Sequence, residues 1–268
     1  MQFNLILGIL LAVAALIFGY SLDGGSVNSL LLVSPIIIVF GGTVFAVIAS
    51  FSLKDIFNAI KSVLSSFSKK SVANPGKIIE TISSLSEQCR KNGLLSLETK
   101  MKNSDLQGDE FLFLKEGILL LIEGRPEEEI QYIMEADIRS YTLQKQIEIS
   151  VFETAAGFSP TMGVIGTVMG LVQVLSNMSN AEELAASIAT AFVATLYGVV
   201  FANIVYLPMA NTLKSILKRQ KVQKEMTVDG ICMISSGVAT RSINNRLSLY
   251  YQAFPDGKKK YRDGIEQS

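Results

Sequence analysis

The side chains that could do chemistry in this sequence are mainly hydroxyls set in long apolar stretches. Thr167 and Thr195 lie inside such stretches, and Thr161, Thr190 and Asn203 lie within or at the edge of them. A threonine oxygen can replace part of the hydration shell of a passing cation, or it can bond to a carbonyl of its own helix. The sequence contains no histidine, which removes the commonest general base and most zinc sites.

No enzyme motif accompanies these hydroxyls. The sequence has no phosphate-binding glycine loop, no GxSxG and no cluster of metal ligands. Cys89 and Cys232 stand far apart in the chain and are expected to be free thiols in a reducing compartment. We therefore expect no catalytic residue, no resident metal and no cofactor. The basic run at 258–260 is too short to indicate a nucleic-acid partner.

The distribution of charge indicates a membrane protein. Charged residues make up 18% of the chain, against about 25% in soluble globular proteins. All 24 lysines and arginines lie in two blocks, residues 54–145 and 214–262. The remaining stretches are too long and too apolar to form a water-facing surface.

Four apolar stretches are long enough to cross a bilayer, which takes about 20 residues of helix. They cover residues 3–20, 30–51, 155–175 and 184–209, and none contains a charged residue. By the positive-inside rule, the N-terminus, segment 54–154 and the tail after 210 lie in the cytoplasm. We therefore predict an all-α integral membrane protein with four transmembrane helices.

The polar parts of the chain are also predicted to be helical. Residues 54–153 form a cytoplasmic helical insertion between the second and third spans, and 211–268 form a helical region with a mobile tail after 254. The third and fourth spans, in region 154–210, extend into these parts without a break. Local patterns support individual helices. An apolar stripe in 56–67 predicts one helix, and a second is predicted to start at Asn74-Pro75 and to end at Gly93. A short buried helix is predicted over 111–122, and another helix is predicted to start at Pro126, followed by Glu127, Glu128 and Glu129.

Small residues recur along the third and fourth spans at steps of three, four and seven residues. Such residues let helix backbones approach closely in lipid. The pattern leaves open whether they pack within the chain's own bundle or on a partner helix. They are Gly163, Gly166, Gly170, Ala191, Gly198 and Ala202.

Two prolines mark the cytoplasmic ends of the same spans. Pro160 and Pro208 can act as hinges, or they can simply punctuate the helices. No span contains the carboxylate that a proton or sodium pathway normally uses. If ions cross here, a partner helix must supply the acid.

Two segments carry a resemblance to a known family. The run from Ser159 to Leu171 (SPTMGVIGTVMGL) resembles the third-span motif of the MotA/TolQ/ExbB family. The segment from Cys89 to Glu98 (CRKNGLLSLE) resembles the cytoplasmic loop of its MotA branch. Four spans with a large insertion after the second also fit that branch, because TolQ and ExbB have three spans.

The resemblance implies a subunit of the flagellar stator, located in the cytoplasmic (inner) membrane of a bacterium. Five copies would surround a dimer of MotB, a one-span protein that supplies the ion-carrying aspartate and anchors the unit to peptidoglycan. Arg90 and Glu98 match the charged pair that engages the rotor switch protein. Thr195 matches the threonine that faces the aspartate, while Pro160 and Pro208 match the prolines that couple ion passage to movement.

The identity of the ion and the class of partner stay open at this point. Thr167 is similar to the residue of sodium-type members, whereas many proton-type members have alanine there, so the sequence favours Na⁺ over H⁺. The lysines and arginines that follow the fourth span, at 214, 218, 219, 221 and 224, could meet anionic lipid headgroups, or they could simply fix the topology from a solvated helix. A TolQ/ExbB-like energiser of an envelope protein is the alternative, and a passive membrane scaffold is a third hypothesis.

Overall fold

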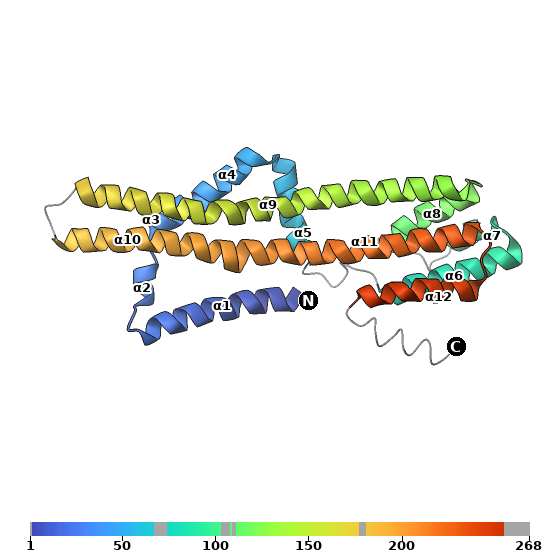
Figure 1. Ribbon diagram of the computed structural model, residues 1–268, viewed down its shortest axis with the longest axis horizontal. Helices are drawn as coiled ribbons and strands as arrows, with labels where there is room; N and C mark the ends of the chain where they lie inside the picture. Colours follow the sequence, from blue (N-terminus) through green and yellow to red (C-terminus); the bar gives the residue numbers. More distant parts are fainter. Residues whose placement is uncertain (1, 67–73, 103–107, 109–110, 177–180, 255–268) are drawn as a thin grey trace. The chain divides into compact units, whose positions relative to one another are not determined.

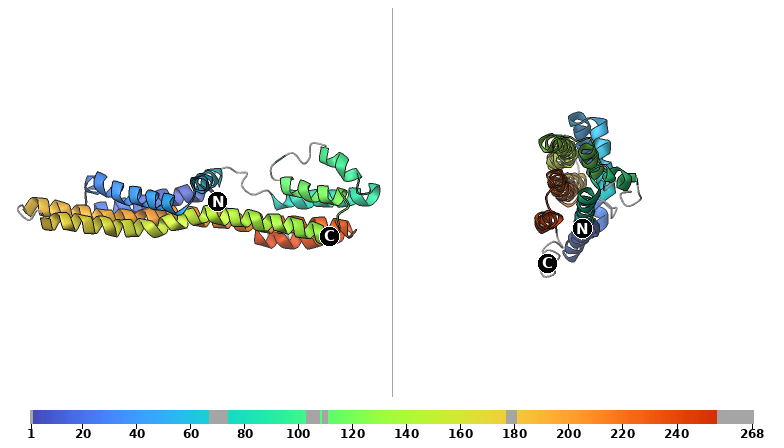
Figure 2. Two further views of the ribbon diagram at one scale, coloured as in Figure 1. Left: turned by 90° about the horizontal axis from the view of Figure 1, so that it is seen from above. Right: turned by 90° about the vertical axis from the view of Figure 1, so that its right-hand side faces the viewer.

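The structure is a computed structural model that describes residues 2–66, 74–102, 108, 111–176 and 181–254. The described residues are almost entirely helical and contain no strand. Two compact units are present (Figures 1 and 2), and each combines segments that are distant in sequence. The first contains Met1–Ser68 and Lys145–Lys214, and the second contains Lys69–Gln144 and Ser215–Ser268.

The first unit holds the apolar helices. Its elements are α1 (Gln2–Leu22), α2 (Val27–Leu30), α3 (Val33–Ile36), η1 (Ile37–Gly41), α4 (Gly42–Ser50), α5 (Leu53–Ser66), the C-terminal half of α9 (Glu127–Ser176), α10 (Ala181–Val200), η4 (Phe201–Tyr206) and the start of α11 (Leu207–Ser235). Within the described part of the chain, four helices are long and apolar enough to cross a membrane, which confirms the four predicted spans. The polar parts of α9 and α11 continue these spans without interruption, as predicted.

The second span differs in detail from the continuous helix predicted over 30–51. Leu31 and Leu32 interrupt it, and the spanning helix begins only at Val33. At this break the carbonyl of Leu30 accepts a hydrogen bond from the Leu32 amide at 3.1 Å and a second one from the hydroxyl of Tyr197. Beyond Pro35 the helix passes through the π-helical turn η1 before regular α-geometry resumes in α4.

The second unit is a helical bundle with its own core. It contains α6 (Pro75–Asn92), α7 (Ser96–Lys102), α8 (Leu112–Ile122), the N-terminal half of α9, the rest of α11, α12 (Thr240–Ser248) and η5 (Leu249–Ala253). Residues from α6, α8, α9, α11 and α12 meet in one apolar cluster; among them Ile82, Ile118, Ile130, Met226, Ile231 and Leu247 are fully buried. The predicted buried helix over 111–122 is therefore confirmed.

The predicted ends of α6 are confirmed in atomic detail. The side chain of Asn74 accepts a hydrogen bond from the Gly76 amide at 3.0 Å, and Pro75 occupies the first helical position. Gly93 ends the helix with a φ of +78°, a conformation that glycine adopts without a steric penalty. The turn and tail predicted after residue 254 lie outside the described residues.

Both cysteines are free. Cys232 lies in the core of the second unit, where burial, helped by Glu127 and Asp229, raises the pKa of its thiol to about 11. The thiol is therefore neutral at physiological pH and behaves as a small apolar side chain.

Candidate functional site: the paired third and fourth spanning helices

Gly163 and Gly198 bring the backbones of α9 and α10 into direct contact. A Cβ added to Gly198 would lie 2.6 Å from the carbonyl oxygen of Ser159, and one added to Gly163 would lie 2.9 Å from that of Ala194. Ser159 is fully buried, and its hydroxyl donates a hydrogen bond of 2.9 Å to the Gly198 carbonyl. The two helices are thus held together at their closest approach by a polar contact as well as by shape.

The contact between the two helices continues toward the C-terminal end of α9 and the N-terminal end of α10. A Cβ on Gly166 would meet the Ala194 methyl at 2.8 Å, and a Cβ on Gly170 would meet that of Ala191 at the same distance. The sequence left two alternatives open for these small residues, packing within the chain's own bundle and packing on a partner helix. The contacts of the four glycines and Ala191 show the first alternative, because each of these residues meets another helix of the chain. Packing on a partner helix stays a prediction. Ala202 is also buried, at 2% exposure.

The hydroxyls of Thr167 and Thr195 meet between these helices. The Thr167 oxygen contacts the Thr195 oxygen, and it lies 2.9 Å from the carbonyl of Ala191 and 3.1 Å from that of Gly163. Four oxygens from two helices thus gather at one half-buried point. Such an arrangement can offer lone pairs to a cation without a formal charge of its own.

The other polar residues of these spans are arranged differently. Thr161 donates to the Phe158 carbonyl at 2.7 Å, and the Asn203 amide donates to the Val199 carbonyl at 2.9 Å, so both have bonds to their own helices. Ser159 was present in the sequence motif but was not assigned a role. Its place immediately before Pro160 was the one local feature that could have drawn attention to it.

The two prolines lie in different backbone settings. Pro160 is inside the continuous helix α9, next to the buried Ser159. Pro208 follows the π-helical turn η4 directly, at the second residue of α11. Proline removes a backbone donor, and π-helical turns are common where a helix accommodates such an irregularity.

Arg90 and Glu98 flank one turn of the second unit. Arg90 lies in the last turn of α6 and Glu98 in the first turn of α7, and both are exposed. Two side-chain hydrogen bonds hold the turn between them. The Gln88 side-chain amide donates to the Ser96 carbonyl at 3.1 Å, and the Ser96 hydroxyl donates to the Gly93 carbonyl at 2.7 Å. The two charges are therefore presented from a fixed segment of backbone.

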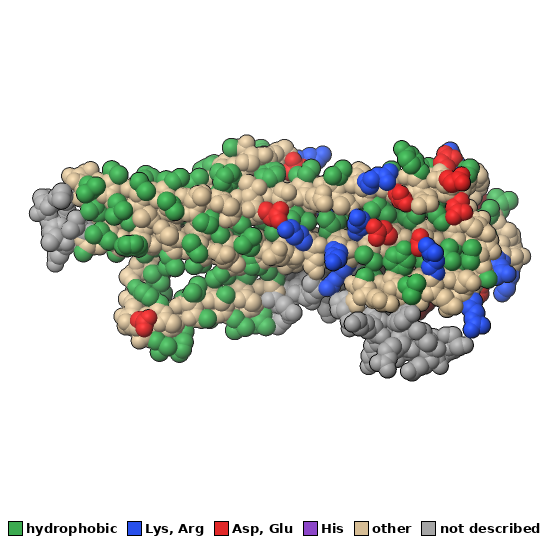
Figure 3. Space-filling model, viewed as in Figure 1, with side chains coloured by type: hydrophobic (Ala, Val, Ile, Leu, Met, Phe, Trp, Pro, Cys, Tyr) green, Lys and Arg blue, Asp and Glu red, His purple; other side chains and the backbone are tan. Residues whose placement is uncertain are grey.

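Several cations after the fourth span have partners within the chain. Lys214 pairs with Glu153, and Lys224 lies 2.6 Å from Asp137 and 3.9 Å from the centre of the Phe113 ring. Lys224 is thereby engaged by its own unit rather than by lipid headgroups. Figure 3 shows the charged side chains gathered over the polar halves of α9 and α11 and over α12, and apolar side chains over α10 and the other half of α9.

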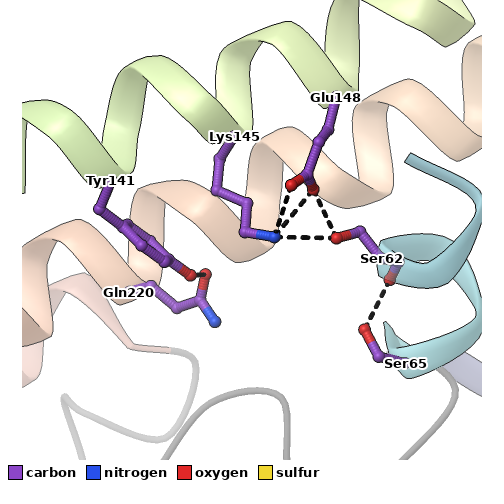
Figure 4. A network of polar contacts seen from close by, with 6 residues as sticks. All are labelled: Ser62, Ser65, Tyr141, Lys145, Glu148 and Gln220. Atoms are coloured by element: carbon purple, nitrogen blue, oxygen red, sulfur yellow. Dashed lines mark hydrogen bonds and ion pairs between the residues drawn. The ribbon is translucent and has the colours of Figure 1, made fainter. Parts of the chain in front are cut away.

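A buried ion pair that the sequence did not predict lies where α9 enters its apolar stretch. The side chain of Glu148 is 4% exposed, and the Lys145 ammonium lies 2.8 and 3.0 Å from its two oxygens (Figure 4). Ser62 of α5 accepts a hydrogen bond from Lys145 at 2.9 Å and donates one to Glu148 at 2.5 Å. The spacing of Lys145 and Glu148 could have suggested a pair, but no local pattern pointed to Ser62.

Fold and site together define a multi-pass helical membrane protein whose two tightly packed helices bring hydroxyls together. Residues 107–226 match the model of the MotA/TolQ/ExbB proton channel family, and residues 6–93 match that of the motility protein A N-terminal region. The chain belongs to the MotA/TolQ/ExbB family, in its motility protein A branch.

Individual relatives cover nearly the whole chain. Motility protein A of Bacillus subtilis is 32% identical over 92% of this chain and 90% of its own length. Chemotaxis protein PomA of Vibrio alginolyticus is 30% identical over 85% of this chain and 87% of its own. The solved flagellar MotAB stator complex of Bacillus subtilis contains a chain with a TM-score of 0.83 and 31% identity, covering 91% of this chain and 94% of that one.

Proposed function

We propose that this chain is a stator subunit of the bacterial flagellar motor and forms, with a MotB-like partner, an ion channel that turns ion flow into torque on the rotor. The observation that carries the proposal is the hydroxyl pair of Thr167 and Thr195 at the contact of two spans that contain no acid. Such spans can line an ion path but need a partner's carboxylate to complete it. The MotAB assembly of the similar Bacillus chain supplies the kind of partner that this requires.

The arrangement of the assembly follows from the same proposal. Five copies form a ring around two MotB-like helices, and closed rings are the usual outcome of head-to-tail contacts between identical subunits. The N- and C-termini and the second unit lie in the cytoplasm, supported by the segregation of positive charge. Arg90 and Glu98 then face the rotor switch protein, and Pro160 and Pro208 act as hinges that couple ion passage to movement.

We further propose that the ion is Na⁺. The family model bears the name of a proton channel family, whereas the hydroxyl of Thr167 favours a hydrated metal ion that must exchange water for protein oxygens. Swimming speed measured against Na⁺ concentration at fixed pH, with and without a protonophore, separates the two ions. Speed should follow Na⁺ in the wild type and lose that dependence in Thr167→Ala. Speed that ignores Na⁺ and collapses with the protonophore would make protons the fuel and leave Thr167 with a packing role.

Deletion of the gene tests the stator function itself. Cells without the chain should assemble flagella of normal number and length that do not rotate, and expression of the chain should restore rotation. Normal swimming in a strain without a paralogue would contradict the proposal. A TolQ/ExbB-like energiser is disfavoured by the four spans and by the match of residues 6–93. Copurification with a peptidoglycan-binding, one-span protein distinguishes the two assemblies.

A further inference from the structure

Helix α5 follows the second span with almost no connecting chain. The spanning helix α4 ends at Ser50 and α5 begins at Leu53. In Figure 1, α5 runs across α9 near the middle of that helix, where α9 enters its apolar stretch, and in the left view of Figure 2 α5 is seen nearly end-on. A helix that crosses a membrane-spanning helix in this way lies along the plane of the membrane, and its first turn starts where the second span leaves the bilayer.

One side of α5 carries large apolar side chains that the chain itself leaves uncovered. Phe57 is 78% exposed, Leu53 67%, Leu64 64% and Ile60 48%. Their spacing of four, three and four residues places them in one narrow stripe. On another side of the helix Ala59 and Ser66 are almost completely buried. Contiguous exposed apolar surface next to a membrane span indicates contact with lipid or with another protein.

The buried ion pair fixes the direction of that stripe. Ser62 bonds to both Lys145 and Glu148 of α9 (Figure 4), and at about 100° per residue it lies roughly half a turn around α5 from Leu53 and Leu64. The contact with α9 therefore turns the stripe away from α9 and holds it there.

The charges of α5 fit a headgroup layer. Lys54 and Lys61 are exposed, and their spacing of seven residues, about two helical turns, places both along the same edge of the apolar stripe. The acidic residue of the helix, Asp55, accepts a hydrogen bond from the Ser52 hydroxyl at 2.5 Å. Lysines beside an apolar stripe extend their ammonium groups toward phosphates while their methylene chains stay in the apolar layer.

We infer that α5 is a membrane-surface helix that binds anionic phospholipid. Leu53, Phe57, Ile60 and Leu64 lie among the acyl chains at the boundary where the second span ends, and Lys54 and Lys61 bind lipid phosphates. The favoured occupant is lipid rather than a second copy of the chain because the stripe is continuous with the end of a span and is edged by cations. This lipid site does not depend on the proposed stator function.

The absence of tryptophan from the sequence makes a direct test possible, because an introduced tryptophan is the single one in the chain. The full-length chain is reconstituted in phosphatidylcholine vesicles that contain brominated lipid, which quenches tryptophan in contact with acyl chains. Phe57→Trp should be quenched strongly. Ser65→Trp, on the polar side of the same helix, should be quenched weakly. Phe45→Trp, at a 72% exposed position of α4, gives the response of a residue inside the bilayer.

The lysines are tested by lipid class. In the Phe57→Trp background, brominated phosphatidylglycerol should quench more than brominated phosphatidylcholine. The double change Lys54→Ala/Lys61→Ala should weaken that preference by roughly fivefold for each lysine removed. A Phe57→Trp emission that resists both brominated lipid and aqueous acrylamide, while Phe45→Trp is quenched by lipid, would show that protein covers the stripe and would overturn the inference. Quenching by acrylamide alone would overturn it as well.

Discussion

A threonine hydroxyl has a single proton to donate, and this decides how Thr167 and Thr195 share their surroundings. The Thr167 oxygen lies near two carbonyls as well as near the Thr195 hydroxyl. If Thr167 donates to either carbonyl, Thr195 must donate to Thr167. The Thr195 oxygen then keeps its lone pairs for another ligand, which makes it the better placed of the two to contact an ion.

Thr195→Val should abolish or severely reduce motility while the protein remains in the membrane at normal level. Valine preserves the shape of the side chain but removes the hydroxyl. An interhelical hydrogen bond in a membrane contributes only about 0.6 kcal/mol on average, so loss of the fold is not the expected cause. Swimming speed and membrane abundance are measured together. Thr195→Ser should keep most of the function.

Thr161→Val is the matched control, because the Thr161 hydroxyl bonds only to its own helix among the described contacts. It should leave swimming unchanged. If Thr195→Val also swam normally, the hydroxyl pair would be a packing contact and the ion path would lie elsewhere.

At this scale the sequence identified the hydroxyls but not their neighbours. Thr167 and Thr195 were singled out because polar atoms are rare in apolar spans. The contact between them joins residues 28 positions apart on different helices, and no local pattern determines it. The contact between Ser62 and Glu148 was even harder to predict from sequence, because those residues are separated by 86 positions and by several helices.

At the scale of helices, glycines set the distance between α9 and α10. Gly198→Ala should destabilise the protein by about 1–3 kcal/mol, because its new Cβ would meet a backbone oxygen, which cannot rotate away. Gly163→Ala should act in the same direction. Thermal denaturation of the purified protein in detergent measures both.

Gly157 offers a control in the same helix as Gly163, since a Cβ there has nothing within 4 Å. Gly157→Ala should leave stability unchanged or raise it by about 0.5–1 kcal/mol, through the better helix propensity of alanine. Equal melting temperatures for Gly198→Ala and Gly157→Ala would show that the helices can move apart without penalty.

The contact between α5 and α9 depends on a buried carboxylate. Lys145→Met leaves Glu148 nearly buried and without its cation, and loss of one partner of a buried pair typically costs about 3–5 kcal/mol. Lys145 is 28% exposed, so water reaches the pair and the lower end of that range is expected. The double change Lys145→Met/Glu148→Gln should recover much of the loss, because no buried charge remains. Melting temperatures of Lys145→Met, Glu148→Gln and the double variant together form a double-mutant cycle. Additive losses in that cycle would contradict a direct coupling between the two residues.

The type of most helices followed from sequence, whereas their interruptions did not. Asn74, Pro75 and Gly93 mark α6 because capping and positive φ are local requirements. The break at Leu31 and Leu32 was not predicted, since one of the hydrogen bonds at this break comes from Tyr197 on another helix. The apolar stripe of α5 was recognised as amphipathic, but which part of it is buried depends on where α9 lies.

At the scale of the molecule, the chain divides its chemistry between two compact units. The first carries the spans and the hydroxyl pair, and the second carries a separate apolar core and exposed charges. Hydropathy was sufficient to separate spans from polar helices. The second core could not be derived from the sequence, because it is built from α6, α8, α9, α11 and α12, whose contacts span much of the chain.

The exposed charges of the second unit lead to a prediction for torque transfer. An ion that crosses the membrane releases about 2.3 kcal/mol per 100 mV, and a rotor contact must transmit this work without binding so tightly that each step stalls. Exposed ion pairs of about 0–1 kcal/mol meet that condition. Arg90, exposed beside a turn that side-chain bonds hold in place, is suited to such a contact.

Arg90→Glu should therefore impair motility strongly, and a reversed charge on the rotor switch protein should restore part of it. Arg139→Glu is the matched control, because Arg139 is also an exposed arginine of the second unit, with a long ion pair to Glu135 at 3.5 Å. That change should leave swimming nearly unaffected. Both substitutions lie on the surface, so stability should change by no more than about 0.5 kcal/mol. Swimming speed is compared for each variant against a panel of rotor charge reversals. If no reversal improves Arg90→Glu, or if Arg139→Glu is equally impaired, the effect comes from the net charge of the unit, and Arg90 is not a specific rotor contact.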